Sequence, residues 1–195
     1  MQEVRERALD AAQALLTERG YGGTTVDRII ERAQVSTGGF FHHFSSKEEA
    51  AAAALERYFD AILERVGATG FMQESDPVGR CLSYVDAVEE LARGELFENG
   101  CLIGTLSQEV SVSHPSIGRL TGELFSRWID FAAGLFRDAA RTTSVQVDAL
   151  ALAEMLVVLV EGALIVRKAR GDNTTIERSF QTYRRMLIDE LSGKE

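Results

Sequence analysis

Proline and cysteine are scarce in this chain, and both shortages limit what it can be. Only two prolines occur among 195 residues, and alternating β-branched runs are few, so helices can continue over long stretches. Two cysteines, Cys81 and Cys101, are too few for a disulfide scaffold. The chain does not open with a basic, then apolar, then small-residue leader. We therefore expect an all-α protein with reduced thiols in the cytoplasm.

A net positive charge, which proteins that bind polyanions commonly carry, is also missing. The formal net charge is −9, although apolar residues at 45% and charged residues at 26% are ordinary for a soluble globular protein. The charge is unevenly distributed, because residues 1–47 hold six basic and six acidic side chains and the acidic excess lies in the remainder. A neutral N-terminal part remains compatible with DNA binding. We expect a single copy to bind DNA with modest affinity, so that effective binding needs a dimer.

One long apolar run, residues 149–166, is nearly long enough to span a bilayer. Glu154 and Glu161 oppose insertion, because a carboxylate near the bilayer centre costs about 2.5 to 3.5 kcal/mol even on lenient scales. A helix that is apolar on all sides in a soluble chain is covered on all sides. We expect no membrane insertion, and a second subunit against one side of this helix.

Helix starts and stops are clear in the N-terminal part. Apolar positions at helical spacing predict a first helix that GYGG, residues 20–23, ends. Thr24 with Asp27 three residues later resembles a capping box for a short second helix. Ser36 is placed to cap a third helix over residues 37–43. Two short helices joined by a tight turn have the dimensions of a helix-turn-helix.

A long fourth helix follows, because Ser46 and Glu49 form a second capping box ahead of a run that continues to about residue 66. Segment 67–77 breaks the helical pattern, and Pro77 begins the next helix. The tripeptide Gly-Asp-Asn at 171–173 is predicted to be the turn between the last two helices.

The third predicted helix opens with two glycines. The recognition helix of a helix-turn-helix must bring its first turn into a major groove about 12 Å wide. Gly38 and Gly39 carry no side chain where the backbone must approach, and Thr37 offers a hydroxyl and a methyl group to a base edge. Glycine costs about 0.8 to 1 kcal/mol per helix position relative to alanine, so this pair indicates close approach to a partner.

The segment TTVDRIIERAQVSTGGFFHHFSSKEE, residues 24–49, resembles the DNA-binding signature of the TetR family of bacterial transcriptional regulators in pattern and order. The rest of the chain resembles the family's ligand-binding and dimerisation domain more loosely. GCLIGTLSQEV, residues 100–110, is similar to the sixth helix of a branch that often begins Gly-Cys. The resemblance implies about nine helices, with a helix-turn-helix domain over 1–47, a connecting helix from about 47, and a ligand-binding and dimerisation domain over 67–195.

The resemblance also implies roles for individual residues toward an operator in double-stranded DNA. Helix 2 would contact the DNA backbone, the third helix would read bases, and the lysine that opens the fourth helix would bind a phosphate. The positions concerned are Thr25, Arg28, Ser36, Thr37, Gly38, Gly39, Phe41, His42 and Lys47. Two of them depart from the family pattern. Thr37 stands where many members have lysine or arginine, and Phe41 stands where most have tyrosine.

In the second domain, the resemblance implies an effector pocket in the helical core and a four-helix interface between two copies. Apolar and aromatic walls imply a hydrophobic or aromatic ligand, although such stripes are also typical of an ordinary core. The candidate pocket residues are Tyr84, Phe97, Leu102, Phe125, Trp128 and Met155. The candidate interface residues are Gly162, Ile176, Phe180, Tyr183 and Leu187.

Several interpretations of the role of Cys101 remain open. At a helix start its thiolate would be favoured, as in a redox or electrophile sensor, but cysteine is also a common buried packing residue. A thiol enzyme with His114 as base lacks an oxyanion-hole loop and a third orienting residue. A helical ligand-binding or scaffolding module without functional DNA binding is the remaining alternative. His42 and His43 lack metal-site spacing, so we predict no metal, cofactor or catalytic residue.

Overall fold

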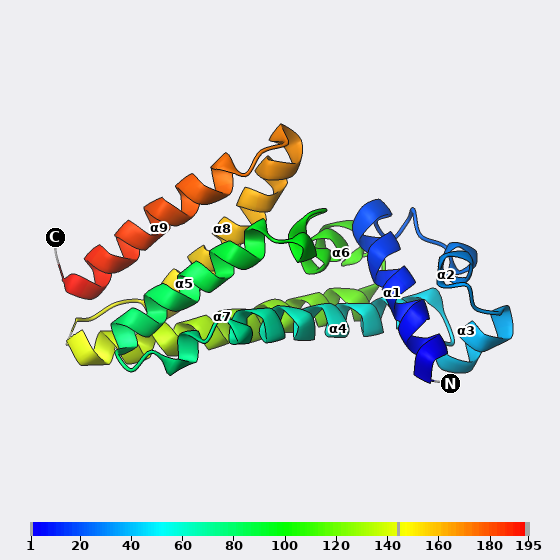
Figure 1. Ribbon diagram of the computed structural model, residues 1–195, viewed down its shortest axis with the longest axis horizontal. Coiled ribbons are helices and arrows are strands. Elements are labelled where there is room, and N and C mark those ends of the chain that lie inside the picture. Colours follow the sequence, from blue (N-terminus) through cyan, green and yellow to red (C-terminus); the bar gives the residue numbers. More distant parts are fainter. Residues whose placement is uncertain (1, 144, 194–195) are drawn as a thin grey trace. The chain divides into compact units, whose positions relative to one another are not determined.

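The computed structural model describes residues 2–143 and 145–193, which form nine α-helices and two short 3-10 helices (Figure 1). The helices are α1 (Gln2–Arg19), α2 (Val26–Ala33), α3 (Thr37–His43), α4 (Lys47–Ala68), α5 (Pro77–Arg93), α6 (Leu102–Val110), α7 (Pro115–Thr143), α8 (Ala149–Arg170) and α9 (Thr174–Ser192), with the 3-10 helices η1 (Phe71–Gln73) and η2 (Glu95–Phe97). The expected all-α fold with about nine helices is confirmed.

The chain divides into two compact units. The first contains the residues up to Ala61 together with Cys101–Leu124, and the second contains Ile62–Gly100 together with the residues from Phe125 onward. The sequence-based limits, 1–47 and 67–195, place α6 in the second domain. In the structure α6 packs against α1 and belongs to the first unit.

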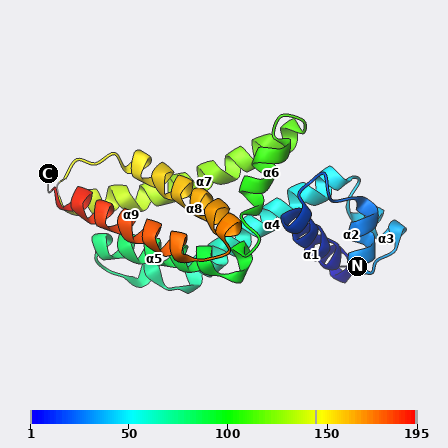
Figure 2. The ribbon, with the colours of Figure 1, turned by 90° about the horizontal axis from the view of Figure 1, so that it is seen from above.

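In the first unit α1, α2 and α3 pack against one another (Figure 2). The shared core contains Leu16, Ile29, Phe40 and Phe44, which are all buried. Phe40 and Phe44 are four residues apart, so they turn the same side of α3 toward this core and leave its other side open. The apolar spacing of the sequence therefore determines which face of α3 is available to a partner.

The cap of α2 differs by one residue from the prediction. Thr25, not Thr24, caps the helix, and its Oγ1 accepts from the backbone N–H of Arg28 at 3.3 Å. Thr24 is buried, and its hydroxyl donates to the carbonyl of Gly20 at 2.8 Å. Because the Thr24 hydroxyl is bonded within the turn between α1 and α2, the next threonine, Thr25, caps α2 instead.

The other two predicted caps are present. The Ser36 side chain accepts from the N–H of Gly39 at 3.0 Å and starts α3. The Ser46 side chain accepts from the N–H of Glu49 at 3.1 Å at the start of α4. The reciprocal contact differs from a standard capping box, because the Glu49 carboxylate accepts from the N–H and the hydroxyl of Ser45, both at 2.6 Å.

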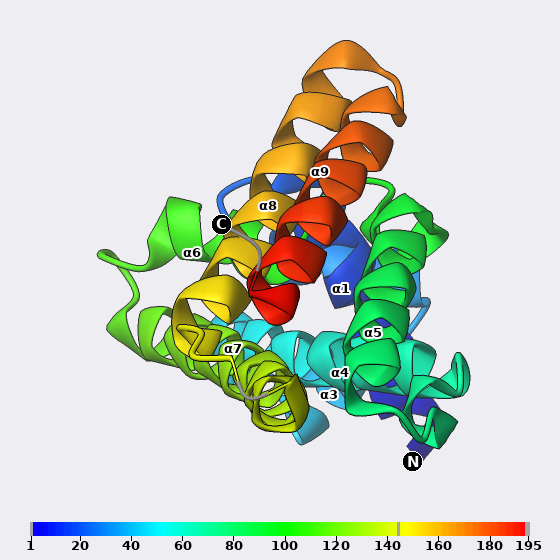
Figure 3. The same ribbon diagram turned by 90° about the vertical axis from the view of Figure 1, so that its left-hand side faces the viewer.

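In the second unit α8 packs along α9, and both contact α5 (Figure 3). Gly171, with φ of +75°, ends α8 in the left-handed conformation, as predicted for the turn at 171–173. The Tyr183 hydroxyl of α9 donates to the carbonyl of Leu152 in α8 at 2.7 Å. A buried apolar face and a satisfied polar group therefore join these two helices.

Helix α8 is long and apolar enough to cross a membrane by length and composition, with a mean hydropathy of 2.3 over its best window. In the structure 44% of that window is buried inside the fold. One side of α8 is therefore covered by the chain itself, whereas Val158 and Ile165 are exposed on the other.

Candidate nucleic-acid interface

The open face of α3 carries most of the residues predicted to read DNA. Thr37, Gly38, Phe41 and His42 are exposed. Phe41 is 50% exposed even though its ring also packs edge-on against Phe40, with centroids 5.3 Å apart. A half-exposed phenylalanine between polar groups gives this face apolar contact area as well as hydrogen-bonding groups. Such a surface suits the methyl groups and polar edges of bases.

The structure separates the two glycines of α3. A Cβ added to Gly39 would lie 3.1 Å from Ser36 Oγ and 3.4 Å from Val4 Cγ1, so the local fold already favours glycine there. A Cβ added to Gly38 would meet nothing within 4 Å. The described structure of the first unit therefore gives no steric reason for glycine at position 38, and the predicted close approach to DNA stays a prediction.

Thr25 and Arg28 lie exposed at the start of α2. Both also have intramolecular roles, since Thr25 caps the helix and the Arg28 guanidinium donates to the carbonyl of Gly23. Lys47 is half-buried, and its ammonium donates to the backbone carbonyls of Tyr21 and Thr24, both at 3.0 Å. Ser36 is committed to the α3 cap. The DNA-facing candidates with no such structural task are therefore on α3.

A capped short helix, a three-residue connection and a second short helix with an open first turn define a helix-turn-helix DNA-binding protein. Residues 8–54 match the family model for bacterial regulatory proteins of the tetR family, and residues 77–182 match the model for the C-terminal domain of LmrA/YxaF-like transcriptional regulators. The chain belongs to the TetR family of bacterial regulatory proteins. It is a transcriptional regulator and not an enzyme.

Several relatives cover nearly the whole chain. The HTH-type transcriptional repressor DhaR of Mycobacterium sp. strain GP1 is 27% identical over 177 residues, which are 90% of this chain and 87% of DhaR. The transcriptional regulator AcuR of Cereibacter sphaeroides is 32% identical over 176 residues, which are 89% of this chain and 80% of AcuR. The crystal structure of a TetR transcriptional regulator from Chloroflexus aurantiacus superposes with a TM-score of 0.87 at 25% identity, covering 97% of this chain and 96% of that one.

The predicted pocket residues do not all lie together. Tyr84, Phe97 and Trp128 are buried in the second unit, where the Trp128 indole N–H donates to the Tyr84 hydroxyl at 2.9 Å. Phe125 is half-buried in the same unit. Leu102, by contrast, is buried in the first unit.

Met155 is the clearest misplacement among these candidates, because 49% of its side chain is exposed on the outer side of α8. It lines a groove of about 550 Å³ along α8 and α9 with Val158, Met186 and other side chains. The apolar composition of α8 concealed its two sides, since a helix that is apolar all round has no polar stripe to mark the surface.

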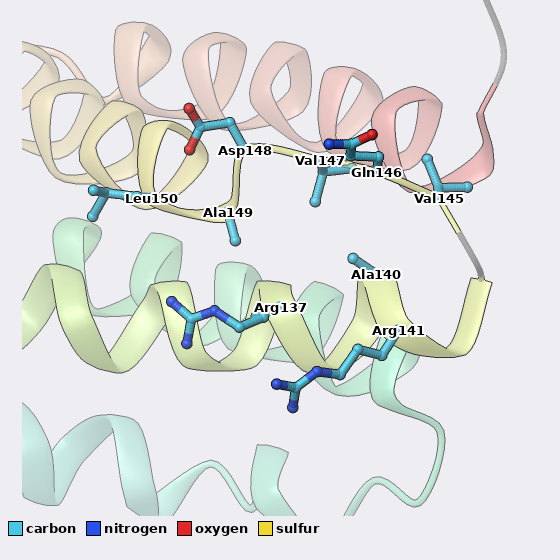
Figure 4. A pocket seen from close by; sticks show the side chains of 9 residues that line it. All are labelled: Arg137, Ala140, Arg141, Val145, Gln146, Val147, Asp148, Ala149 and Leu150. Carbon is cyan, nitrogen blue, oxygen red and sulfur yellow. The ribbon is translucent and has the colours of Figure 1, made fainter.

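A second cavity of about 690 Å³ lies where α7 ends and α8 begins (Figure 4). Ala149 at the start of α8 and Ala140 on α7 both point into the space between the two helices, and Arg137 lies on the α7 side of it. Asp148 is committed to capping α8, where its carboxylate accepts from the N–H of Ala151 at 3.0 Å. None of the predicted pocket residues lines this cavity.

Four of the five predicted interface residues are core residues of the chain itself. Ile176, Phe180, Tyr183 and Leu187 are buried along α9 within a single copy, and only Gly162 lies on an exposed surface. The periodicity identified the apolar face of α9 correctly, but that face is covered by α8 and α5 of the same chain. On the neighbouring helix α8, by contrast, Val158 and Ile165 are exposed.

Both cysteines are buried. The Cys81 thiol donates to the carbonyl of Leu135 at 3.2 Å, and burial raises the pKa of this thiol to about 12. Cys101 is 3% exposed and occupies the N-cap position of α6. His114, the base in the thiol-enzyme reading, packs its ring against Tyr21 at 4.6 Å between centroids.

Two residues, Tyr21 and Glu109, make contacts in the first unit that were not predicted from the sequence. The Glu109 carboxylate accepts from the backbone N–H groups of Tyr21 and Gly22 at 2.6 and 2.7 Å. The signal in the sequence was the glycine-rich run GYGG, residues 20–23, which was predicted only to end the first helix. It marks a turn that another group approaches closely.

Proposed function

We propose that the protein is a homodimeric repressor that binds a palindromic operator through α3 and is released by a small apolar or aromatic effector. The observation that carries the proposal is the exposed face of α3, where Thr37, Gly38, Phe41 and His42 stand free of the core. Thr37 and His42 would read bases, and Gly38 would allow the backbone to approach the DNA. The protein would act in the cytoplasm, without a membrane.

The test of operator binding is selection of bound fragments from a random pool of duplex DNA. We expect enrichment of a palindrome whose half-sites place two recognition helices about 34 to 36 Å apart or somewhat wider. A palindrome would establish DNA binding, dimerism and half-site spacing together. If no sequence is enriched at low salt, the proposed repressor function is wrong.

The proposed effector site is the aromatic core of the second unit around Tyr84, Phe97, Phe125 and Trp128. The Tyr84 ring also packs against Phe71, with centroids 5.3 Å apart. Aromatic side chains of this kind suit an apolar or aromatic ligand held by few polar groups. Release requires that the effector binds the operator-free form more tightly, typically by about 1 to 3 kcal/mol of coupling. Equal effector affinity with and without operator DNA would exclude this mechanism.

The proposed dimer interface is the outer side of α8. Met155, Val158, Ile165 and Val166 are exposed there, and Gly162 on the same helix lets a partner approach closely. An apolar face of this length on a soluble regulator is typical of a subunit interface. If two copies pair through α8 and α9, these helices form a four-helix interface. That interface would cover the apolar side of α8 that the fold leaves exposed.

Replacing Val158 by glutamate should convert the dimer to a monomer and abolish binding to the palindrome. Val158 is 69% exposed, so the change leaves the chain's own core intact but places a carboxylate in the interface. The matched control is Val112→Glu, because Val112 is 92% exposed in the first unit. Sedimentation velocity should show a monomer only for the Val158 variant. A dimeric Val158→Glu protein would move the interface elsewhere.

Cys101 is proposed to be a packing residue rather than a sensor, because it is almost fully buried. We expect the wild type and Cys101→Ser to release operator DNA equally after hypochlorite, peroxide or quinone treatment. Gel-shift titration of both proteins against the selected operator measures this. Release of the wild type alone would instead make thiol modification the inducing signal.

A further inference from the structure

The turn between α1 and α2 is held by two charged side chains from distant parts of the first unit. The carboxylate of Glu109, near the end of α6, accepts the N–H groups of Tyr21 at 2.6 Å and Gly22 at 2.7 Å. The ammonium of Lys47, at the start of α4, donates to the carbonyls of Tyr21 and Thr24, both at 3.0 Å. An anion and a cation thus satisfy opposite polar groups of one turn, through hydrogen bonds roughly twice as strong as neutral ones.

The glycines of this turn make room for the carboxylate. A Cβ on Gly20 would lie 2.3 Å from Glu109 Oε2, and Gly20 also has a φ of +69°. A Cβ on Gly22 would lie 3.1 Å from Glu109 Oε1. The GYGG sequence is therefore matched to a carboxylate nearly 90 positions away in the chain, and the separation of 88 residues between Tyr21 and Glu109 is spanned by the fold.

Tyr21 is the centre of the arrangement. Its ring is buried, with the Lys47 Nζ 3.7 Å from the ring centroid and the His114 ring 4.6 Å away between centroids. A cation over an aromatic face is stabilised by the ring quadrupole. Burial lowers the pKa of the Lys47 ammonium, and the negative charge of Glu109 opposes that shift. The Lys47 ammonium is therefore in contact with two backbone carbonyls and one aromatic ring of the first unit.

We propose that Glu109 and Lys47 form a clamp that positions the helix-turn-helix for operator binding, with Lys47 acting on the protein's own turn rather than on a DNA phosphate. The clamp fixes the turn that leads into the Thr25 cap of α2, and α2 in turn packs against α3. Glu109 contributes to operator affinity without touching DNA. The inference rests on the proposed operator binding.

The first test compares Glu109→Gln with Glu123→Gln. Glutamine keeps the shape of Glu109 but turns an N–H₂ group toward one of the two amides. Glu123 is exposed on α7 in the same unit, so its variant controls for the loss of one negative charge. We expect Glu109→Gln to weaken operator binding at least about tenfold at every salt concentration, whereas Glu123→Gln binds as the wild type or slightly more tightly. Equal behaviour of the two variants would overturn the clamp.

The second test measures the salt dependence of operator binding by Lys47→Met, which keeps an apolar stem over Tyr21. A lost phosphate contact flattens the slope of log K against log salt by about 0.9 for each contact. The clamp predicts weaker binding by about tenfold or more with an unchanged slope. A slope flatter by about one unit per monomer would return Lys47 to the phosphate contacts and remove it from the clamp.

The third test is a double-mutant cycle between Gly22→Ala and Glu109→Ala, which removes the carboxylate that the methyl group would meet, with circular dichroism melting curves for each protein. Gly22→Ala leaves both charges in place but pushes a methyl group against the carboxylate, so it should weaken operator binding several-fold. The same change should have little further effect when residue 109 is already alanine, because no side-chain end is left for the methyl group to meet. Independent effects would contradict the clamp, even if the Glu109 variant folds poorly. Absence of operator binding by the wild type would instead refute the proposed function itself.

Discussion

Replacing Gly38 by alanine is expected to stabilise the protein while weakening operator binding at least about tenfold. A Cβ at this position meets nothing within 4 Å, so the added methyl group causes no clash in the free protein. Alanine in a helix is favoured over glycine by up to about 1 kcal/mol. On DNA the same methyl group would occupy the space into which the backbone of α3 must move. Overpacking of a tight contact costs about 1 to 3 kcal/mol, and 1.4 kcal/mol corresponds to a factor of ten.

The measurement is a pair of curves for each variant, namely urea denaturation and operator titration. Gly122→Ala is the matched control, because Gly122 is an exposed glycine within α7 of the same unit and its added Cβ also meets nothing within 4 Å. We expect the control to gain stability and to bind DNA as the wild type does. If Gly38→Ala binds the operator with unchanged affinity, the first turn of α3 does not approach DNA closely.

Replacing Arg167 by methionine should lower the free energy of unfolding by about 3 kcal/mol, within a range of about 2 to 5 kcal/mol. Arg167 is a buried arginine of α8, and its guanidinium donates to the carbonyls of Ala92, Phe97 and Glu98. These carbonyls lie at the end of α5, at the last residue of η2 and at the residue after it, where the helix geometry leaves acceptors without intrahelical donors. Methionine fills a similar volume but donates to none of them, although the Phe97 carbonyl also accepts from the N–H of Gly100 at 2.9 Å.

Lys168→Met is the matched control for the Arg167 variant. Lys168 is the next residue of α8, but it is exposed and its ammonium donates only to the carbonyl of Asn99 among the contacts described, at 3.2 Å. We expect a loss below about 1 kcal/mol for this variant, as for other exposed hydrogen bonds of a lysine. Urea denaturation followed by circular dichroism gives both values. Similar small losses for the two variants would mean that water replaces the guanidinium at the three carbonyls.

The residues that start and end helices could be interpreted from the sequence because capping depends on neighbours within four positions. Ser36 and Ser46 accept the predicted backbone N–H groups, and Gly171 ends α8 in the left-handed conformation. The helix-turn-helix and its exposed recognition face follow from the same local rules, with Phe40 and Phe44 turned inward by their spacing. The shift of the α2 cap from Thr24 to Thr25 arose because the tertiary turn uses the Thr24 hydroxyl.

The sequence by itself determined the helical fold, the capped helices of the DNA-binding head and the residues that α3 exposes, because periodicity and capping are local properties. The tertiary structure alone decided what covers each apolar face. Ile176 and Phe180 are buried inside one copy, whereas Met155 is exposed on α8. Only the tertiary structure showed that α6 belongs to the first unit and that Glu109 lies at the turn containing Tyr21. A repeating apolar pattern marks a face for burial but contains no information about which surface, near or far in the chain, will bury it.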